Sequence, residues 1–128
     1  MAVRRALKIV DKKKKVVMTT KPDRMKGTAF HLVNFIDYAD DSVVSKTLLK
    51  KTTGNITLFA FDAGQGLSEH TAPFDAVVYI LDGQARITIG GEPHSVGDGE
   101  MLIMPANISH ALHAESRFKM LLVMIRGE

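Results

Sequence analysis

Short apolar runs separated by turn residues make up most of the chain after residue 26. Some of them alternate strictly, as in Ala85, Ile87 and Ile89 against Arg86 and Thr88. The predicted strands are residues 43–49, 56–61, 76–81, 85–89, 101–104 and 118–125. Turn residues lie between them at 53–55, 62–66, 90–92 and 97–99, and at 82–83, where Asp-Gly is a strong turn dipeptide. This spacing predicts an antiparallel sandwich or barrel. The one helical candidate is short, at residues 31–38.

The first 26 residues follow a different pattern. Two short β-branched runs flank a charged turn, which favours either a hairpin or a helix over residues 2–10. The Lys-Pro-Asp sequence at 21–23 is a turn signal and marks a boundary. We therefore divide the chain into a basic N-terminal arm, residues 1–26, and a domain, residues 27–128. One interpretation is that residues 1–24 are an extension ahead of a domain that starts near Met25.

Composition narrows the class of protein. The 128 residues are 45% hydrophobic and 24% charged, which is typical of one globular domain. The absence of cysteine excludes disulfides, thiolate zinc sites and cysteine nucleophiles. The longest apolar stretches are far too short to span a bilayer, and no apolar core of a secretory signal follows the first basic residues. We expect a soluble, cytoplasmic, single-domain protein without a membrane partner.

The net charge of +3 is the sum of two opposite parts. Residues 1–30 contain ten Lys and Arg and two acidic residues, a charge of +8, whereas residues 31–128 carry −5. The lysine run at 12–15 is typical of a solvated turn or tail, with contact to nucleic acid as the alternative. However, no recognition-helix pattern is present, and residues 1–29 contain no aromatic residue for base stacking. We expect no specific nucleic-acid partner.

Two stretches carry the candidate chemistry, residues 64–83 and 99–110. The first has Gly64, His70 and Gly83, and the second has Gly99, Pro105 and His110, with Asn107 at a further position. In their spacing these residues resemble the two sequence motifs of the cupin superfamily, with Asn107 in place of a motif glycine. The match spans residues 64–110, and the flanking strands extend it over about 27–126. The resemblance implies an all-β fold, an antiparallel jelly-roll β-barrel, and a homodimer in which the N-terminal segment packs on the partner.

The resemblance also implies a divalent metal site, which this sequence has largely lost. Such sites use two histidines and a glutamate of the first motif and one histidine of the second. His70 and His110 keep ligand identities, but Ala72 and Ala76 stand at the other two positions and have no donor atom. Metal sites in proteins usually need three or four protein donors. We therefore expect Fe, Mn, Ni or Zn to bind weakly or not at all.

A carboxylate could still complete the site. Asp75 is next to the vacant glutamate position, and a bulge in the Pro73–Phe74–Asp75 segment would turn it inward. His70, His110 and Asp75 would then form a two-histidine, one-carboxylate site of the sort that suits iron(II). Otherwise Asp75 points to solvent or caps the turn. Glu69 is a poorer candidate because strand alternation directs it away from its neighbour His70.

Alternation also predicts the barrel interior. If His70 faces inward, Ala72, Ala76, Val78 and Ile80 do so too, and Leu112 shares the face of His110. In the last strand either Phe118, Met120 and Leu122 or Lys119, Leu121 and Val123 face inward, and the second set is disfavoured because it buries Lys119. The candidate ligand-binding residues are His70, His110, Ala72, Ala76, Val78, Phe118 and Met120. The two alanines enlarge an apolar cavity beside the histidines, which suits a small, partly apolar organic ligand.

Three functions remain open at this point. The first is a binding module that holds a small molecule near His70 and His110. The second is a metal-dependent enzyme of dioxygenase or isomerase type, with Asp75 or water in the vacant ligand positions. The third is a purely structural role. Fold alone does not choose among them, and no catalytic residue can be assigned.

Overall fold

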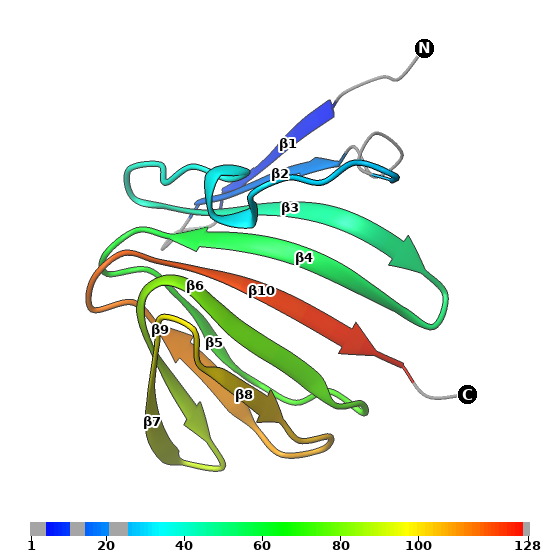
Figure 1. Cartoon of the computed structure of the whole chain (residues 1–128). Helices are drawn as coiled ribbons and strands as arrows, with labels where there is room; N and C mark the ends of the chain where they lie inside the picture. The colour runs from blue at the N-terminus through cyan, green and yellow to red at the C-terminus, as the bar shows by residue number, and fades with distance from the viewer. Residues whose placement is uncertain (1–4, 11–14, 21–25, 127–128) are drawn as a thin grey trace.

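The computed structural model describes residues 5–10, 15–20 and 26–126, and nearly all of its regular structure is β-strand (Figure 1). The strands are β1 (Arg5–Val10), β2 (Lys15–Thr20), β3 (Ser42–Lys51), β4 (Gly54–Phe61), β5 (Gly66–His70), β6 (Ala76–Ile89), β7 (Glu92–Gly97), β8 (Met101–Met104), β9 (His110–His113) and β10 (Phe118–Ile125). The predicted helix at 31–38 is wrong, because only the 3₁₀ turn η2 (Leu32–Asn34) forms there. No helix in the described part of the chain is long and apolar enough to cross a membrane.

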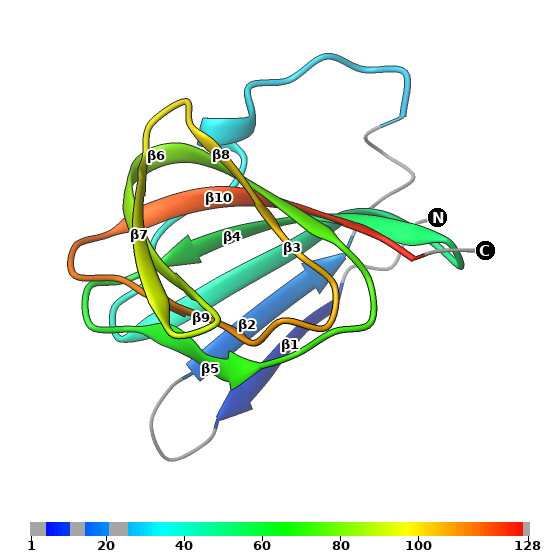
Figure 2. The same cartoon turned by 90° about the horizontal axis from the view of Figure 1, so that it is seen from below.

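The strands form one curled sheet with the order β1-β2-β3-β4-β10-β6-β9-β5, and β7 and β8 also pair with β6. All pairings are antiparallel except that of β2 with β3. The sheet closes round on itself, so that β5, β7 and β9 lie opposite β3, β4 and β10 (Figures 1 and 2). This is the jelly-roll β-barrel that the sequence predicted.

The two predicted strands at 76–81 and 85–89 are a single strand, β6, and the predicted turn between them is wrong. The first half of β6 pairs with β10 up to Gly83, and its second half pairs with β7 and β9. Gly83 has a φ of 83°, and a Cβ there would collide with the backbone oxygen of Arg117. The pairing register with β10 also shifts between Lys119 and Met120. Leu81 is therefore the extra residue of a bulge beside the Asp-Gly dipeptide, and here β6 bends from one side of the barrel to the other.

The barrel interior is filled by the inward faces of β6 and β10. Val78, Ile80, Phe118 and Met120 are each 0% exposed. Phe118 stacks on Phe61 of β4 with ring centroids 4.4 Å apart. The prediction that Phe118 and Met120 of the last strand face the barrel interior is thus confirmed.

The opposite face of the same sheet is buried as well. Its core consists of Ile36, Leu48, Leu58 and Ala60, against which residues of the η2 segment pack. Lys119 lies on this face and is only 9% exposed, and its Nζ donates a hydrogen bond to the backbone oxygen of Val33 at 2.7 Å. The sequence argument against burying Lys119 is wrong, because the η2 segment provides a carbonyl partner for the ammonium group.

The N-terminal arm contributes two strands to the edge of the sheet. β1 and β2 pair as an antiparallel hairpin, and β2 runs parallel to β3 with Lys15 opposite Ser42. The hairpin interpretation is therefore confirmed against the helix over residues 2–10. Residues 11–14, with most of the lysine run, lie outside the described residues, so the prediction of a solvated turn is not tested.

Candidate functional site

Two histidine side chains face each other across the β5–β9 pair. His70 is the last residue of β5 and His110 the first of β9, and the two are direct partners in the antiparallel register. Their Nε2 atoms lie 3.2 Å apart, and the ring planes are inclined at 70°. His110 is only 5% exposed, whereas His70 is exposed. The fold thus brings together the two histidines that the sequence motifs singled out.

An irregularity in β5 creates this arrangement. Leu67 is opposite Leu112 while His70 is opposite His110, so β5 has one residue more than β9 over this stretch. An extra residue of this kind reverses which face the following side chains occupy. Leu67 and His70 consequently line the same cavity, although they are three residues apart.

Backbone carbonyls fix the protons on both imidazoles. The Nδ1 atom of His70 lies 2.8 Å from the oxygen of Ser68, and that of His110 lies 3.3 Å from the oxygen of Ile108. A carbonyl oxygen only accepts hydrogen bonds, so we assign the proton of each neutral ring to Nδ1. In these tautomers both Nε2 atoms are hydrogen-bond acceptors that lie 3.2 Å apart, and the contact is a hydrogen bond only where one ring carries its proton on Nε2 instead.

The electrostatics agree with a neutral His110. Burial lowers the pKa of the His110 imidazole below its ordinary value, and the nearby charge of His70 lowers it further. The hydrogen bond to the Ile108 carbonyl opposes these two effects but is weaker. Burial and the charge of His70 thus favour the neutral form of the inner imidazole.

The two imidazoles form part of the wall of a cavity of about 70 Å³. The cavity is lined by Leu67, His70, Ala72, Phe74, Ala76, Met104, His110, Leu112, Met120, Leu122 and Met124. Five of the seven candidate ligand-binding residues are therefore in its lining. The other two, Val78 and Phe118, are fully buried in the interior core and do not reach the cavity surface.

Two loops are tied together beside this cavity. The amide of Asn107 donates to the oxygen of Ala72 at 2.7 Å, and the amide of Ala106 donates to Oδ1 of Asp75 at 2.8 Å. Asn107 has a φ of 66°, a left-handed conformation that glycine and asparagine adopt most readily. The carboxylate of Asp75 thus holds the 105–109 loop and does not line the cavity.

Glu69 directly precedes His70 and Ser109 directly precedes His110, and the two side chains interact. The hydroxyl of Ser109 donates to Oε2 of Glu69 at 2.9 Å, which joins β5 to the start of β9. Glu69 is exposed and lies outside the cavity lining, in agreement with strand alternation. This pair therefore positions the strands that carry the histidines.

Comparison with known proteins gives the family. A model described as the cupin domain matches residues 57–126. This chain belongs to the cupin family. A conserved protein of unknown function from Streptococcus pyogenes has a similar structure, with a TM-score of 0.76 and 39% identity over 80% of this chain and 90% of that one. A cupin 2 conserved barrel domain protein from Leptotrichia buccalis has a TM-score of 0.74 and 40% identity over 76% of this chain and 47% of that one.

One curated relative also matches this cupin. It is an uncharacterized protein of Streptomyces coelicolor, 32% identical over 65 residues. The match covers 51% of this chain and 62% of the relative, so it spans less than two thirds of that protein.

The donor set of this cupin does not fit a divalent metal centre. Among the described residues, no group of three or more histidine, cysteine, aspartate or glutamate side chains is placed to hold a metal ion. Ala72 and Ala76 line the cavity without a donor atom, and the structure does not bring Asp75 to the two imidazoles. Two neutral nitrogens alone leave a divalent ion short of ligands and of negative charge.

Sequence reasoning found Met120 but missed the other two methionines of the cavity, Met104 and Met124. Met124 could have been found, because it continues the inward face of Met120 and Leu122 by alternation. Met104 could not, because no motif fixes which face of the short strand β8 is turned inward. Phe74 could not be found either, because it lies in the loop before β6, where strand alternation does not fix the direction of a side chain.

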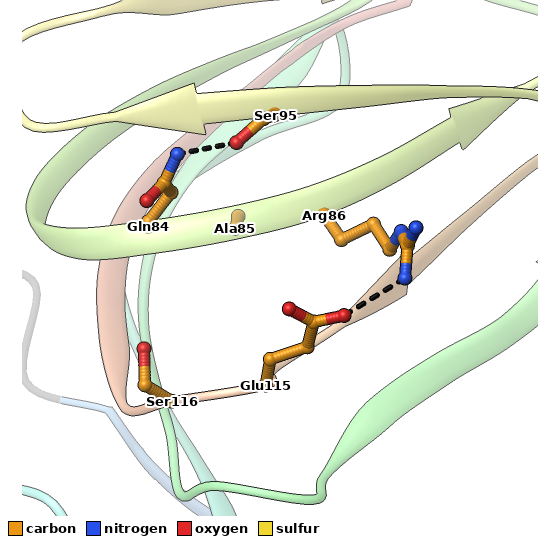
Figure 3. Close-up of a pocket in the computed structure, with 6 residues that line it drawn as sticks. All are labelled: Gln84, Ala85, Arg86, Ser95, Glu115 and Ser116. Carbon is orange, nitrogen blue, oxygen red and sulfur yellow. Dashed lines mark hydrogen bonds and ion pairs between the residues drawn. The ribbon is translucent and has the colours of Figure 1, made fainter.

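A second, polar pocket of about 300 Å³ lies where β6 and β7 approach the turn before β10 (Figure 3). Four of its polar side chains are paired with each other. Gln84 donates to the hydroxyl of Ser95, and Arg86 forms an ion pair with Glu115 at 2.8 Å. The side chains of this ion pair are 54% and 69% exposed, so water screens their charges. The side chains that line this pocket therefore include no buried, unpaired polar group that a ligand would satisfy.

Proposed function

We propose that this cupin binds a small, partly apolar molecule in the cavity beside His70 and His110. The observation that carries the proposal is the pair of Nε2 atoms, 3.2 Å apart, in the wall of an otherwise apolar cavity. Pockets with apolar walls and a few convergent polar groups are typical of small-molecule sites.

The chemistry of the walls indicates the kind of ligand. Both Nε2 atoms are hydrogen-bond acceptors in the assigned tautomers, so a ligand would offer them a hydroxyl or an N–H group. Its apolar part would lie against Ala72, Ala76 and Met120. The volume of about 70 Å³ is smaller than a 150 Å³ cavity that binds benzene. The buried part of the ligand is therefore only a few atoms, and the remainder would extend past the exposed His70.

Phenol and anisole form a matched pair of probes for this proposal. They share an aromatic ring, but only phenol has a hydroxyl donor. We expect saturation-transfer NMR on the full chain to show binding of phenol and much weaker binding of anisole. His110→Phe should abolish the preference, whereas His113→Phe, on an exposed position of the same strand, should keep it. Equal binding of the two probes, or an unchanged preference in His110→Phe, would contradict the proposal.

The proposal also covers the localisation, oligomeric state and partners of the protein. We infer a cytoplasmic homodimer without a specific nucleic-acid or membrane partner. The family resemblance supports the dimer, and the charge of −5 on residues 31–128 argues against nucleic acid. Light scattering of the full chain after gel filtration tests the mass, and a monomer at micromolar concentration would refute the dimer.

A further inference from the structure

An apolar groove lies on the outer face of the barrel, where the β3–β4 turn meets the end of β10 (Figure 1). Leu49 of β3 is opposite Ile56 of β4, and Ile56 is opposite Val123 of β10. Directly opposed residues in antiparallel strands share a face, so these three side chains form one row across the sheet. Ile125, two residues after Val123, lies on the same face and is 60% exposed. The four side chains line a groove of about 310 Å³.

A glycine leaves the next row of the sheet open. Lys51 is opposite Gly54, and Gly54 is opposite Ile125. A Cβ at position 54 would collide with the backbone oxygen of Met124, so a side chain does not fit there without a shift of the backbone. The centre of this row is therefore backbone alone. The groove thus extends from the apolar row to the Lys51 side chain with no side chain in between.

Basic side chains gather at this end of the groove. Lys51 and Arg126 line the groove, and Lys50 joins them in the adjoining depression. Neither lining contains an aspartate or a glutamate, and none of the three cations forms an ion pair with another described residue. The guanidinium of Arg126 lies over the ring of Phe74, 5.4 Å from its centroid, and the Arg126 amide donates to the backbone oxygen of Thr53 at 2.7 Å. Arg126 is therefore held in place by contacts that do not neutralise its charge.

An apolar floor beside a group of cations favours an amphipathic anion. An alkyl chain on the floor gains free energy roughly in proportion to the apolar area that it removes from water. A carboxylate at its end accepts charge-assisted hydrogen bonds from the guanidinium and ammonium groups. A neutral molecule of the same shape gains only the first term, and a cationic one is repelled. The volume of about 310 Å³ is at the lower end of the range of small-molecule pockets, which suits a short chain.

We propose that this outer groove binds a free carboxylate with a short alkyl chain. The chain lies against Leu49, Ile56 and Val123, and the carboxylate lies at Lys51 and Arg126. The site is distinct from the histidine cavity, since Met124 is the one described residue that lines both. The proposal therefore does not depend on the binding of phenol beside His110.

The test is an NMR titration of the full chain, labelled with ¹³C at its isoleucine methyl groups, with octanoate below its micellar concentration. We expect saturable shifts of the Ile56 and Ile125 methyl signals. The signal of Ile103, which is 55% exposed on the outer face of β8 and lies outside the groove lining, should stay in place.

Related molecules separate the contribution of the charge from that of the chain. Octan-1-ol has the same chain without a charge and should bind about three- to tenfold more weakly, since each exposed ion pair contributes roughly 0.2–1 kcal/mol. Octylamine, with a positive charge, should bind more weakly still. Hexanoate should lose up to about fourfold in affinity for each missing methylene. Added salt should weaken the binding of octanoate but not that of octan-1-ol.

Variants at exposed positions test the same two contributions without disturbing the core. Ile125→Ser should weaken octanoate binding by more than about threefold, because it removes part of the apolar floor. Ile103→Ser is its matched control, because the two isoleucines are 55% and 60% exposed on the same face. Lys51→Gln should lower the affinity by up to about fivefold, whereas Lys51→Arg keeps the charge and should bind as the parent does.

Several results would overturn the groove proposal. They are equal affinity for octanoate and octan-1-ol, unchanged affinity in Lys51→Gln, and equal shifts of the Ile103 and Ile125 methyl signals, which would indicate unspecific adsorption. An Ile125 signal that shifts with protein concentration in the absence of ligand would mean that a second copy of the chain covers the groove, which also contradicts the proposal. Displacement of phenol by octanoate would place octanoate in the histidine cavity instead. Phenol binding is measured without octanoate, so each proposal can fail without the other.

Discussion

Replacing Ala76 by glutamate should turn this cavity into a zinc site, and the size of the effect follows from the structure. Ala76 is 5% exposed and lines the same cavity as His70 and His110. A glutamate there adds an anionic oxygen ligand, which gives the two-histidine, one-glutamate set of many zinc sites. We expect Zn²⁺ to bind the Ala76→Glu variant and to leave the parent protein unaffected.

The effect on stability should change sign with zinc. In metal-free protein the larger side chain costs about 1–3 kcal/mol by overpacking. The existing cavity of about 70 Å³ places the cost toward the lower end of that range. A shift of 1 kcal/mol corresponds to roughly 3–5 °C in Tm for a domain of this size. Zinc at a free concentration of 100 times its Kd would restore about 2.7 kcal/mol. The Tm should therefore fall without zinc and rise above the parent value with it.

Differential scanning calorimetry with and without Zn²⁺ measures this change. Ala63→Glu, which adds the same carboxylate at an exposed position, is the control and should show no zinc response. Adding His70→Gln to the Ala76→Glu variant should abolish the response. If zinc raised the Tm of the parent protein as much as that of the variant, the reasoning would be refuted, because the two imidazoles alone would then suffice to bind zinc.

Three further predictions concern the frame of the site. Gly83→Ala should lower the free energy of unfolding in urea by about 1–3 kcal/mol, since φ is 83° and a Cβ collides with backbone, whereas Gly91→Ala, with φ of 85° in open space, should cost less. The lowered pKa of His110 means that the unfolded chain binds more protons below pH 6.5, so the stability of metal-free protein should fall as the pH drops from 8 to 5. His110→Asn should flatten that slope in urea unfolding, and an unchanged slope would contradict the assignment. Lys119→Met should cost about 1–3 kcal/mol, because the carbonyl of Val33 loses a charged donor, and faster amide exchange in the η2 segment would locate the loss.

The sequence predicted the strand pattern and the histidine pair because both depend on local rules. Alternation and turn residues placed β3, β4, β8, β10 and both halves of β6 but missed the short strands β5, β7 and β9. Motif spacing singled out His70 and His110 before any pairing was known. The direct opposition of these two residues in β5 and β9 then followed from the barrel. Interior parity was also correct for β10, since burying Phe118 and Met120 satisfies the simplest hydrophobic argument.

Features that depend on a distant partner were not predictable in this way. Asp82-Gly83 has the composition of a hairpin turn, but it lies inside β6 next to the bulge at Leu81, because Gly83 pairs with Phe118 of β10, 35 residues further along the chain. Burial of Lys119 requires a carbonyl from the η2 segment, which is 86 residues away in sequence. The extra residue in β5 likewise appears only when that strand is aligned with β9. In each case a contact between distant parts of the chain determined the structure, and a rule based on neighbouring residues could not predict it.

The same distinction explains why the loss of two ligand positions does not leave the cavity inert. Ala72 and Ala76 stand at two ligand positions of the sequence motif and have no donor atom, so the motif alone leaves only the two histidines. The strand pairing adds Met104 and Met124 on either side of Ala76, from segments 28 and 48 residues later. The lining of the folded cavity therefore contains methionines and histidines but no carboxylate, so its chemistry differs from that of a carboxylate-containing centre. Its preference for hydrogen-bond donors over divalent ions should follow from that difference, and the phenol and zinc experiments measure the two preferences separately.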